Sequence, residues 1–238
     1  ATLFTGRHIE IHVLPFSFKE YCTYYHSDSD LQTLFERYVV NGGLSGSYVY
    51  EKERGRVDYV KNVYHTILRR DLTEKYHLPD SRMLEQVAEF MMDNISNTTS
   101  PNNVSHCLSA NGTATNHSTV GSYLKYLCDA FMLYKVPRYD IQGKKYLQSL
   151  DKYYLADSGI RFAVLGKRNM DYGRVYENLV ALELLRRGYS IYVGKLYKKE
   201  IDFVAMRENE KIYIQVSDDI SSLETFQRET DPLIKIRD

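Results

Sequence analysis

Hydrophobic residues in the first part of the chain follow two different periods. Residues 8–14 alternate apolar and polar side chains, which predicts a short strand that Pro15 ends. Ser17 then stands where the N-cap of a helix is expected. Further helices are expected over residues 31–39, ended by Asn41-Gly42-Gly43, and over residues 60–68. A strand followed by helices, without a sheet of its own, indicates the tail of a domain.

The pattern changes between residues 79 and 155. Helix-like segments there are followed by two strand-like segments around a turn that contains Gly143. The helices are expected over residues 84–95, over 101–108 after Ser100-Pro101, and over 118–131 with Ser118 as its cap; the strands are expected over 132–138 and 145–150. Three short helices followed by a hairpin predict a winged helix.

The remaining residues, 156–238, alternate between helix and strand patterns. A helix is expected over residues 175–187, where Gly188 stops it. Strands are expected over 189–193, 200–205 and 211–216, and the short charged turn between the last two favours an antiparallel hairpin. The fold class predicted for the whole chain is therefore mixed α/β.

Composition narrows the classes of function. The 31 basic and 31 acidic residues cancel, which argues against a strongly basic nucleic-acid binder. No apolar run approaches the roughly 20 residues that span a bilayer, so no membrane partner is expected. The cysteines, Cys22, Cys107 and Cys128, form no metal-ligand pair and no disulfide framework, which favours a reducing compartment and a cytoplasmic location.

Several ordered blocks of sequence resemble a known family. The blocks are Thr5-Gly6-Arg7, Leu14-Pro15-Phe16-Ser17-Phe18, Asn41-Gly42-Gly43, Tyr154-Leu155-Ala156-Asp157-Ser158-Gly159, Glu177-Asn178-Leu179-Val180 and Glu200-Ile201-Asp202-Phe203-Val204. Together they resemble prokaryotic AAA+-type P-loop ATPases that carry a C-terminal domain of unknown function 4143. The resemblance implies that ATP and Mg²⁺ bind to an ATPase core upstream, and that residues 1–78 are the helical, lid-like end of that core.

The ATPase signature itself is absent from the chain. A phosphate-binding loop needs G-x-x-x-x-G-K-[ST], and the nearest mimic, Gly159…Gly166-Lys167-Arg168, has the wrong spacing. We therefore expect neither ATP hydrolysis nor a bound cofactor in this chain alone. By the resemblance, Arg7 lies beside the ATPase core and could sense the charge of a γ-phosphate; the alternative is a structural surface arginine.

The C-terminal blocks also resemble a restriction-endonuclease-type core. That fold places one acid on a helix, an aspartate on a strand, and Glu-x-Lys on the next strand, so that carboxylates bind Mg²⁺ and the lysine assists the attacking water. Glu177 and Asp202 match the two acids, whereas Gln215-Val216-Ser217 stands in place of Glu-x-Lys. The site is therefore degenerate, no metal is assigned to it, and a purely structural role for the acids is the alternative. A lysine elsewhere could supply the missing ammonium, and the candidates are Lys195, Lys198 and Lys199.

The winged-helix pattern offers a second candidate surface. Its third helix would enter a DNA groove and its hairpin would contact phosphates. The candidate residues are Lys125 on the helix and Arg138, Lys144 and Lys145 on the hairpin. Seven basic residues between positions 80 and 155 are offset by seven acidic ones, so any DNA binding is expected to be weak, and a protein-docking role is the alternative.

These patterns predict three parts: residues 1–78 as the end of an ATPase domain, 79–155 as a winged helix, and 156–238 as a nuclease-like α/β domain. The function predicted for the chain is an effector region of an ATPase that binds DNA or a protein partner. Two alternatives stay open, a Mg²⁺-dependent nuclease and a protein-interaction module that binds no nucleic acid.

Overall fold

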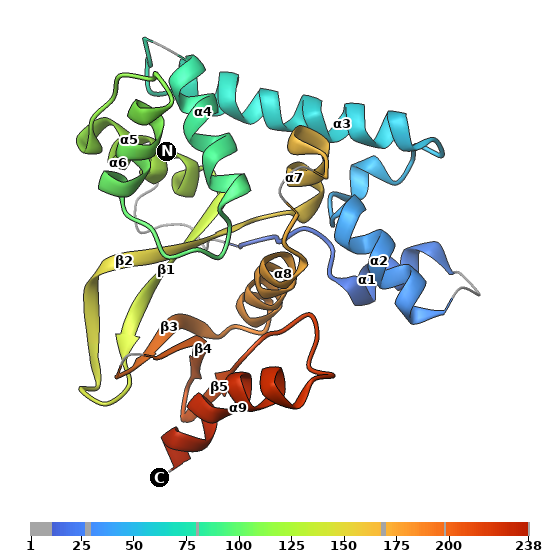
Figure 1. Cartoon of the computed structure of the whole chain (residues 1–238). Coiled ribbons are helices and arrows are strands. Elements are labelled where there is room, and N and C mark those ends of the chain that lie inside the picture. Colours follow the sequence, from blue (N-terminus) through green and yellow to red (C-terminus); the bar gives the residue numbers. More distant parts are fainter. Residues whose placement is uncertain (1–10, 27–29, 80, 168–169, 198, 238) are drawn as a thin grey trace.

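A five-stranded sheet runs through the lower half of the molecule in this computed structural model, which describes residues 11–26, 30–79, 81–167, 170–197 and 199–237 (Figure 1). The strand order is β2-β1-β3-β4-β5. The strands are β1 Leu133–Asp140, β2 Lys145–Leu155, β3 Ser190–Leu196, β4 Lys199–Arg207 and β5 Glu210–Ile214. Neighbours pair antiparallel except β1 and β3, which run parallel.

The parallel contact between β1 and β3 joins two parts that the sequence patterns keep apart. Residues 138–140 of β1 pair with residues 193–195 of β3, so the hairpin and the C-terminal strands share one sheet. The mixed α/β class is confirmed. The finer division into a winged helix and a nuclease-like domain is not confirmed, because the hairpin and the C-terminal strands form one sheet. Neither local pattern could indicate a pairing between segments so far apart in the sequence.

The first two N-terminal helices follow the predicted positions, whereas the third extends beyond its predicted bounds at both ends. They are α1 Phe18–Tyr25, α2 Leu31–Asn41 and α3 Glu53–Thr66, which continues as a π-helical segment, Ile67–Glu74. Ser17 caps α1 in a capping box with Glu20, as its position predicted. The strand expected over residues 8–14 is wrong where the structure describes it: residues 11–14 have no strand partner, and an alternating pattern alone does not make a strand.

The middle helices are α4 Ser81–Asp93, α5 Pro101–Ala110 and α6 His117–Asp129. Ser100 caps α5, but Asn116 rather than Ser118 caps α6. α8 Tyr172–Arg186 matches a predicted helix. The sequence patterns did not predict two further helices, α7 Ser158–Leu165 and α9 Leu223–Arg237. α7 is buried on every side over most of its length. It therefore lacks the alternation of apolar and polar faces by which a surface helix is recognised in a sequence.

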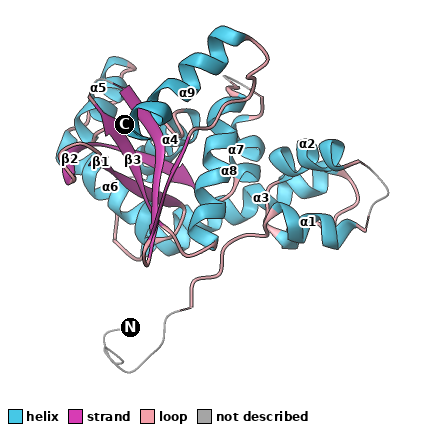
Figure 2. Cartoon of the chain, turned by 90° about the horizontal axis from the view of Figure 1, so that it is seen from below, coloured by secondary structure: helices cyan, strands magenta, loops and turns pink. Residues whose placement is uncertain are grey.

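Two large apolar cores hold these elements together. The first extends from Val39 to Val175 and joins α3, α4, α6 and α7 to the base of the hairpin, so it crosses both predicted boundaries, at 78 and 155. The second lies between α8 and the sheet and includes Tyr154, Ala181 and Phe203. Figures 1 and 2 show α8 lying along the sheet, between the strands and the N-terminal helices. α8 is therefore the helix through which the sheet and the helical part meet.

A tight junction connects α2 to the start of α7. The buried carboxylate of Asp157 accepts a hydrogen bond from the backbone N–H of Gly43. Burial raises the pKa of Asp157 to about 6, although backbone donors around it act in the opposite direction. Gly42 has a positive φ of 71° and packs directly against the Asp157 side chain, so only a residue without a Cβ fits there.

Gly42→Ala should therefore lower the free energy of unfolding by more than about 2 kcal/mol, because it adds both backbone strain and a clash with Asp157. Gly112→Ala is the matched control, since Gly112 also has a positive φ, 89°, but a Cβ there would meet nothing within 4 Å. Urea denaturation of both variants measures the difference. Equal losses would show that the Asp157 junction contributes no specific constraint.

Candidate functional site

A group of charged side chains lies where α8 faces the sheet. We call it the carboxylate cluster: Lys152 from β2, Glu177 from α8, and Glu200 and Asp202 from β4. Residues two apart on a strand point to the same side, which aims both Glu200 and Asp202 at Lys152. Because β1 and β3 separate β2 from β4 in the strand order, the Lys152–Glu200 contact requires the sheet to curl.

The ammonium of Lys152 sits among the three carboxylates. Its Nζ lies 2.9 Å from Oε1 of Glu177, 2.8 Å from Oε1 of Glu200 and 3.6 Å from Oδ1 of Asp202. The Lys152 side chain is only 3% exposed, whereas Glu200 is 35% exposed and borders the solvent. A lysine this buried is retained only when opposite charges surround it.

Neighbouring groups fix the orientation of the acids. The hydroxyl of Tyr154 donates to Oε1 of Glu177 at 2.7 Å, and the backbone N–H of Val216 donates to Oδ2 of Asp202 at 2.8 Å. Arg138 from β1 adds a guanidinium 3.9 Å from Glu200. Each carboxylate of the cluster thus has a cation beside it.

Burial dominates the protonation of the cluster. It raises the pKa of Glu177 to about 7, although Lys152 acts in the opposite direction. Burial also raises the pKa of Asp202. For Lys152, burial lowers the pKa, but the three carboxylates together outweigh burial and the net shift is upward. The lysine therefore stays charged at neutral pH while Glu177 exchanges its proton there.

The geometry does not fit a divalent cation. Carboxylate oxygens are suitable ligands for Mg²⁺, but the Lys152 ammonium already contacts all three acids. Over the described ranges, no set of three or more histidine, cysteine, aspartate or glutamate side chains is arranged so that it could hold a metal ion. The cluster is charge-compensated by the chain itself.

The predicted nuclease-like residues do come together. Glu177 and Asp202 both contact Lys152, and Oε1 of Gln215 lies 3.3 Å from the backbone nitrogen of Asp202. The amide of Gln215, however, donates to Glu229 rather than facing the acids. The ammonium comes from Lys152 and not from the lysines proposed from the sequence; Lys199 pairs with Asp231, Lys195 is not part of the cluster, and Lys198 lies outside the described residues.

The other predicted residues are dispersed. Arg7 lies outside the described residues. Lys125 pairs with Asp129 on the surface of α6, while Lys144 and Lys145 are exposed at the tip of the hairpin. Arg138 is withdrawn into the carboxylate cluster. The four basic residues therefore form no common surface.

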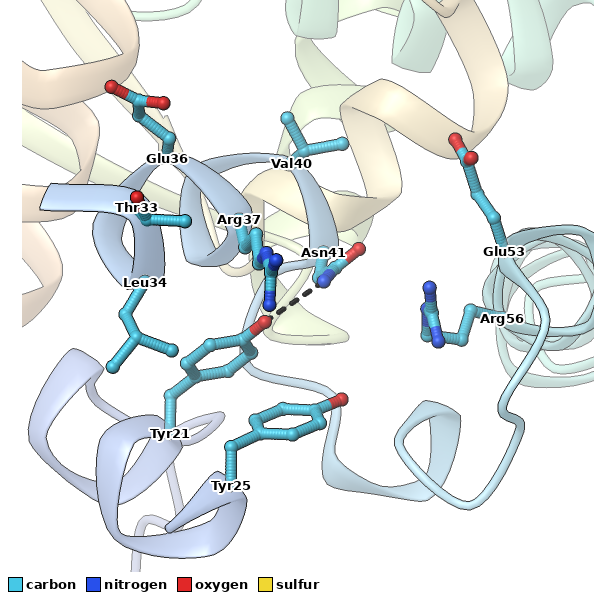
Figure 3. Close-up of a pocket in the computed structure, with 10 residues that line it drawn as sticks. All are labelled: Tyr21, Tyr25, Thr33, Leu34, Glu36, Arg37, Val40, Asn41, Glu53 and Arg56. Atoms are coloured by element: carbon cyan, nitrogen blue, oxygen red, sulfur yellow. Dashed lines mark hydrogen bonds between the residues drawn. The ribbon is translucent and has the colours of Figure 1, made fainter. Parts of the chain in front are cut away.

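A separate open cavity of about 580 Å³ lies among the N-terminal helices (Figure 3). We call it the arginine–tyrosine pocket, after Tyr21, Tyr25, Arg37 and Arg56 on its wall. In Figure 3 the two phenols and the two guanidinium groups face the same space, while the carboxylate of Glu36 points away from the phenols. α1 supplies the tyrosines, α2 supplies Arg37, and α3 supplies Arg56.

The donors in this pocket are only partly used. The Arg37 side chain makes no hydrogen bond or ion pair with any residue that the structure describes. Arg56 donates through Nη1 to the carbonyls of Tyr50 and Glu51, but its buried Nε has no acceptor within the described chain. Burial raises the pKa of Tyr21 and of Tyr25, so both phenols stay protonated as donors. The pocket therefore offers several donors to an anionic group, with Glu53 as an acid on the same wall.

Sequence reasoning missed both Lys152 and this pocket. Lys152 lies inside β2, directly before the buried residues Tyr153-Tyr154-Leu155, and a lysine next to such a run was the available signal. No local pattern marks the pocket, because its four named residues come from three helices.

Comparisons with known proteins give family membership but no activity. A family model described as "Domain of unknown function (DUF8612)" matches residues 32–171, more than half of the chain. An uncharacterized protein of Haemophilus influenzae is 36% identical over 100% of this chain and 59% of its own length. An uncharacterized protein of Methanocaldococcus jannaschii is 24% identical over 91% of this chain and 51% of its own length. No solved structure matches the chain significantly.

These findings overturn the family predicted from sequence blocks. Membership of the AAA+-type ATPases with domain of unknown function 4143 is wrong, because the matching family is a different one and its description mentions no ATPase. The predicted descriptions of the chain as ATPase-related and DNA-binding are also wrong, since neither relative is described in either way. Short blocks of glycine, aspartate and strand residues recur in many α/β proteins, so their order alone was not specific. The chain spans little more than half the length of these two relatives.

Lys152→Met should lower the free energy of unfolding by about 3–5 kcal/mol, because three acids lose the cation among them. Lys135→Met is the matched control on the partner strand: Lys135 pairs with Asp151 at 2.9 Å but is 53% exposed. Loss of the Lys135–Asp151 ion pair should lower the free energy of unfolding by only about 0–1 kcal/mol. Urea denaturation compares the two, and similar values would mean that Lys152 does not organise the cluster.

Stability should also fall as pH rises from about 4.5 to about 7. The folded state keeps the Glu177 proton up to a pKa of about 7, whereas the unfolded chain loses it near 4.5, so the folded state binds more protons in this window. Asp157, with its pKa raised to about 6, adds a slope of the same sign. Glu177→Gln should reduce the decline without abolishing it, and chemical denaturation at pH 5 and pH 7.5 measures both slopes. An unchanged slope would contradict the assignment.

Proposed function

The chain belongs to the family described as Domain of unknown function (DUF8612), and we propose that it is a binding module that docks an acidic segment of a partner protein in the arginine–tyrosine pocket. One observation carries the proposal: the guanidinium groups of Arg37 and Arg56 and the phenols of Tyr21 and Tyr25 face one open cavity of about 580 Å³. Tyrosine and arginine are the residue types that dominate the energetics of protein interfaces.

Charge complementarity selects the kind of occupant. Arg37 engages no acid of the described chain, and the Nε of Arg56 has no acceptor there. A carboxylate entering the pocket would receive charge-assisted hydrogen bonds from the guanidinium of Arg37, which no group of the described chain engages. Two exposed rings lie next to pocket residues, Tyr24 against Tyr25 and Tyr50 beside Arg56, and would extend the contact beyond the bound acid.

A nuclease is the less supported candidate. The order α8-β3-β4-β5-α9 places an acid on a helix and another on the middle strand, as expected of a restriction-endonuclease-like core. We infer that this arrangement persists as a scaffold. Lys152 contacts the acids that a metal would need, so the chemistry that requires Mg²⁺ has no support from the geometry.

The proposal predicts that a fluorescein-labelled hexaglutamate peptide binds the chain, and that Arg37→Gln weakens this binding roughly tenfold or more, the effect of losing a charge-assisted hydrogen bond. Arg37→Gln should leave the fold intact, because the side chain makes no internal hydrogen bond or ion pair in the described chain. Fluorescence anisotropy at low salt measures the affinity.

Arg54→Gln is the matched control. Arg54 lies on the same helix as Arg56, its side chain is 93% exposed, and it does not line the pocket. It should change the affinity little. If Arg54→Gln and Arg37→Gln weaken binding equally, the peptide is held by general charge attraction and not by the pocket. If hexaglutamine binds as well as hexaglutamate, the pocket does not select an acid.

A further inference from the structure

A second, smaller cavity borders the arginine–tyrosine pocket. This cavity, of about 120 Å³, lies between α3 and α7, and we call it the apolar pocket after the side chains of Val57, Val60, Phe162 and Ala163 on its wall. The two cavities share four wall residues, Val40, Asn41, Glu53 and Arg56. A single bound segment can therefore reach both.

Resting on the proposed function, we propose that the docked segment carries an acidic residue beside a branched aliphatic residue, with the acid in the arginine–tyrosine pocket and the aliphatic side chain in the apolar pocket. The shared wall makes the two side chains near neighbours in the bound segment. This pair of positions defines the partner by its chemistry, as a protein segment in which an aspartate or glutamate adjoins a leucine, isoleucine or valine.

The size of the apolar pocket limits its occupant. A cavity of about 150 Å³ with apolar walls accommodates one benzene molecule, so about 120 Å³ suits one branched aliphatic side chain and is small for an indole. Burying such a side chain next to valine and phenylalanine is favourable, whereas an unpaired polar group there would lose its hydration.

The unshared parts of the two walls separate the two positions. Glu53 and Arg56 line both cavities, and each cavity has one further cation, Arg37 in the larger and Lys167 in the smaller, so charge alone does not orient the segment. The larger cavity adds the phenols of Tyr21 and Tyr25 as donors, whereas the smaller adds the apolar side chains of Val57, Val60, Phe162 and Ala163. The segment is therefore oriented by its aliphatic side chain, which fits the apolar walls of the smaller cavity and leaves the acid to the donors of the larger one.

Four blocked tetrapeptides test this inference: acetyl-Gly-Glu-Leu-Gly-amide, and the versions in which glutamine replaces glutamate, alanine replaces leucine, or both. Protein NMR chemical shifts, followed as each peptide is titrated into the millimolar range, give the affinities. The parent peptide should bind more tightly than the alanine version by roughly tenfold or more, because leucine buries one methine and two methyl groups that alanine lacks.

Val57→Thr keeps the volume of the wall but adds a hydroxyl, so it should reduce the preference for leucine while leaving the preference for glutamate over glutamine unchanged. Arg37→Gln should reduce the preference for glutamate over glutamine while leaving the preference for leucine over alanine unchanged. This opposite pattern distinguishes the two cavities even though each single effect is small.

The outcomes separate this inference from the proposed function. Preference for glutamate without preference for leucine would overturn the paired recognition and leave the acid-binding function standing. Preference for leucine alone, or no binding of any peptide at ~10 mM, would overturn both, since typical weak but specific complexes are detected at such concentrations.

Discussion

A single buried ammonium governs how the sheet and its covering helix fit together. Lys152 comes from the hairpin, yet it contacts one acid on α8 and two on β4. Bringing these charges out of water is costly, and the cost is offset only while all of them stay in contact. The parallel pairing of β1 with β3 joins the hairpin to the strand pair that contains β4, and the curl of the sheet then brings β4 near β2. With α8 above the sheet, Lys152 contacts all three acids.

The same arrangement is connected to the proposed binding surface through buried elements. Asp157, two residues beyond the end of β2, is the N-cap residue of α7, and its carboxylate holds the Gly42–Gly43 turn at the end of α2. α2 and α7 in turn supply walls of the arginine–tyrosine pocket and the apolar pocket. The carboxylate cluster is thus linked to the proposed binding surface through contiguous buried elements.

Local sequence patterns predicted the elements better than their assembly. Ser17 and Ser100 were recognised as helix starts because a cap acts within one turn, and the β4–β5 hairpin followed from its short turn. Glu177 and Asp202 were correctly associated. Lys152 was not, because its partners lie 25 or more residues away and an isolated lysine looks like a surface residue. The arginine–tyrosine pocket could not be predicted from the sequence for the same reason, since Arg37 and Arg56 become neighbours only when α2 and α3 pack together.

We propose that Lys152 takes the place of a divalent cation, so that the carboxylate cluster holds no metal ion. Isothermal titration calorimetry of Mn²⁺ into the unaltered chain at pH 7.5, beside the Asp202→Asn variant, measures whether the cluster binds one. We expect no saturable binding that depends on Asp202, because the ammonium of Lys152 already lies 3.6 Å from that carboxylate. Stoichiometric Mn²⁺ binding that Asp202→Asn abolishes would contradict it and restore the nuclease as the better description.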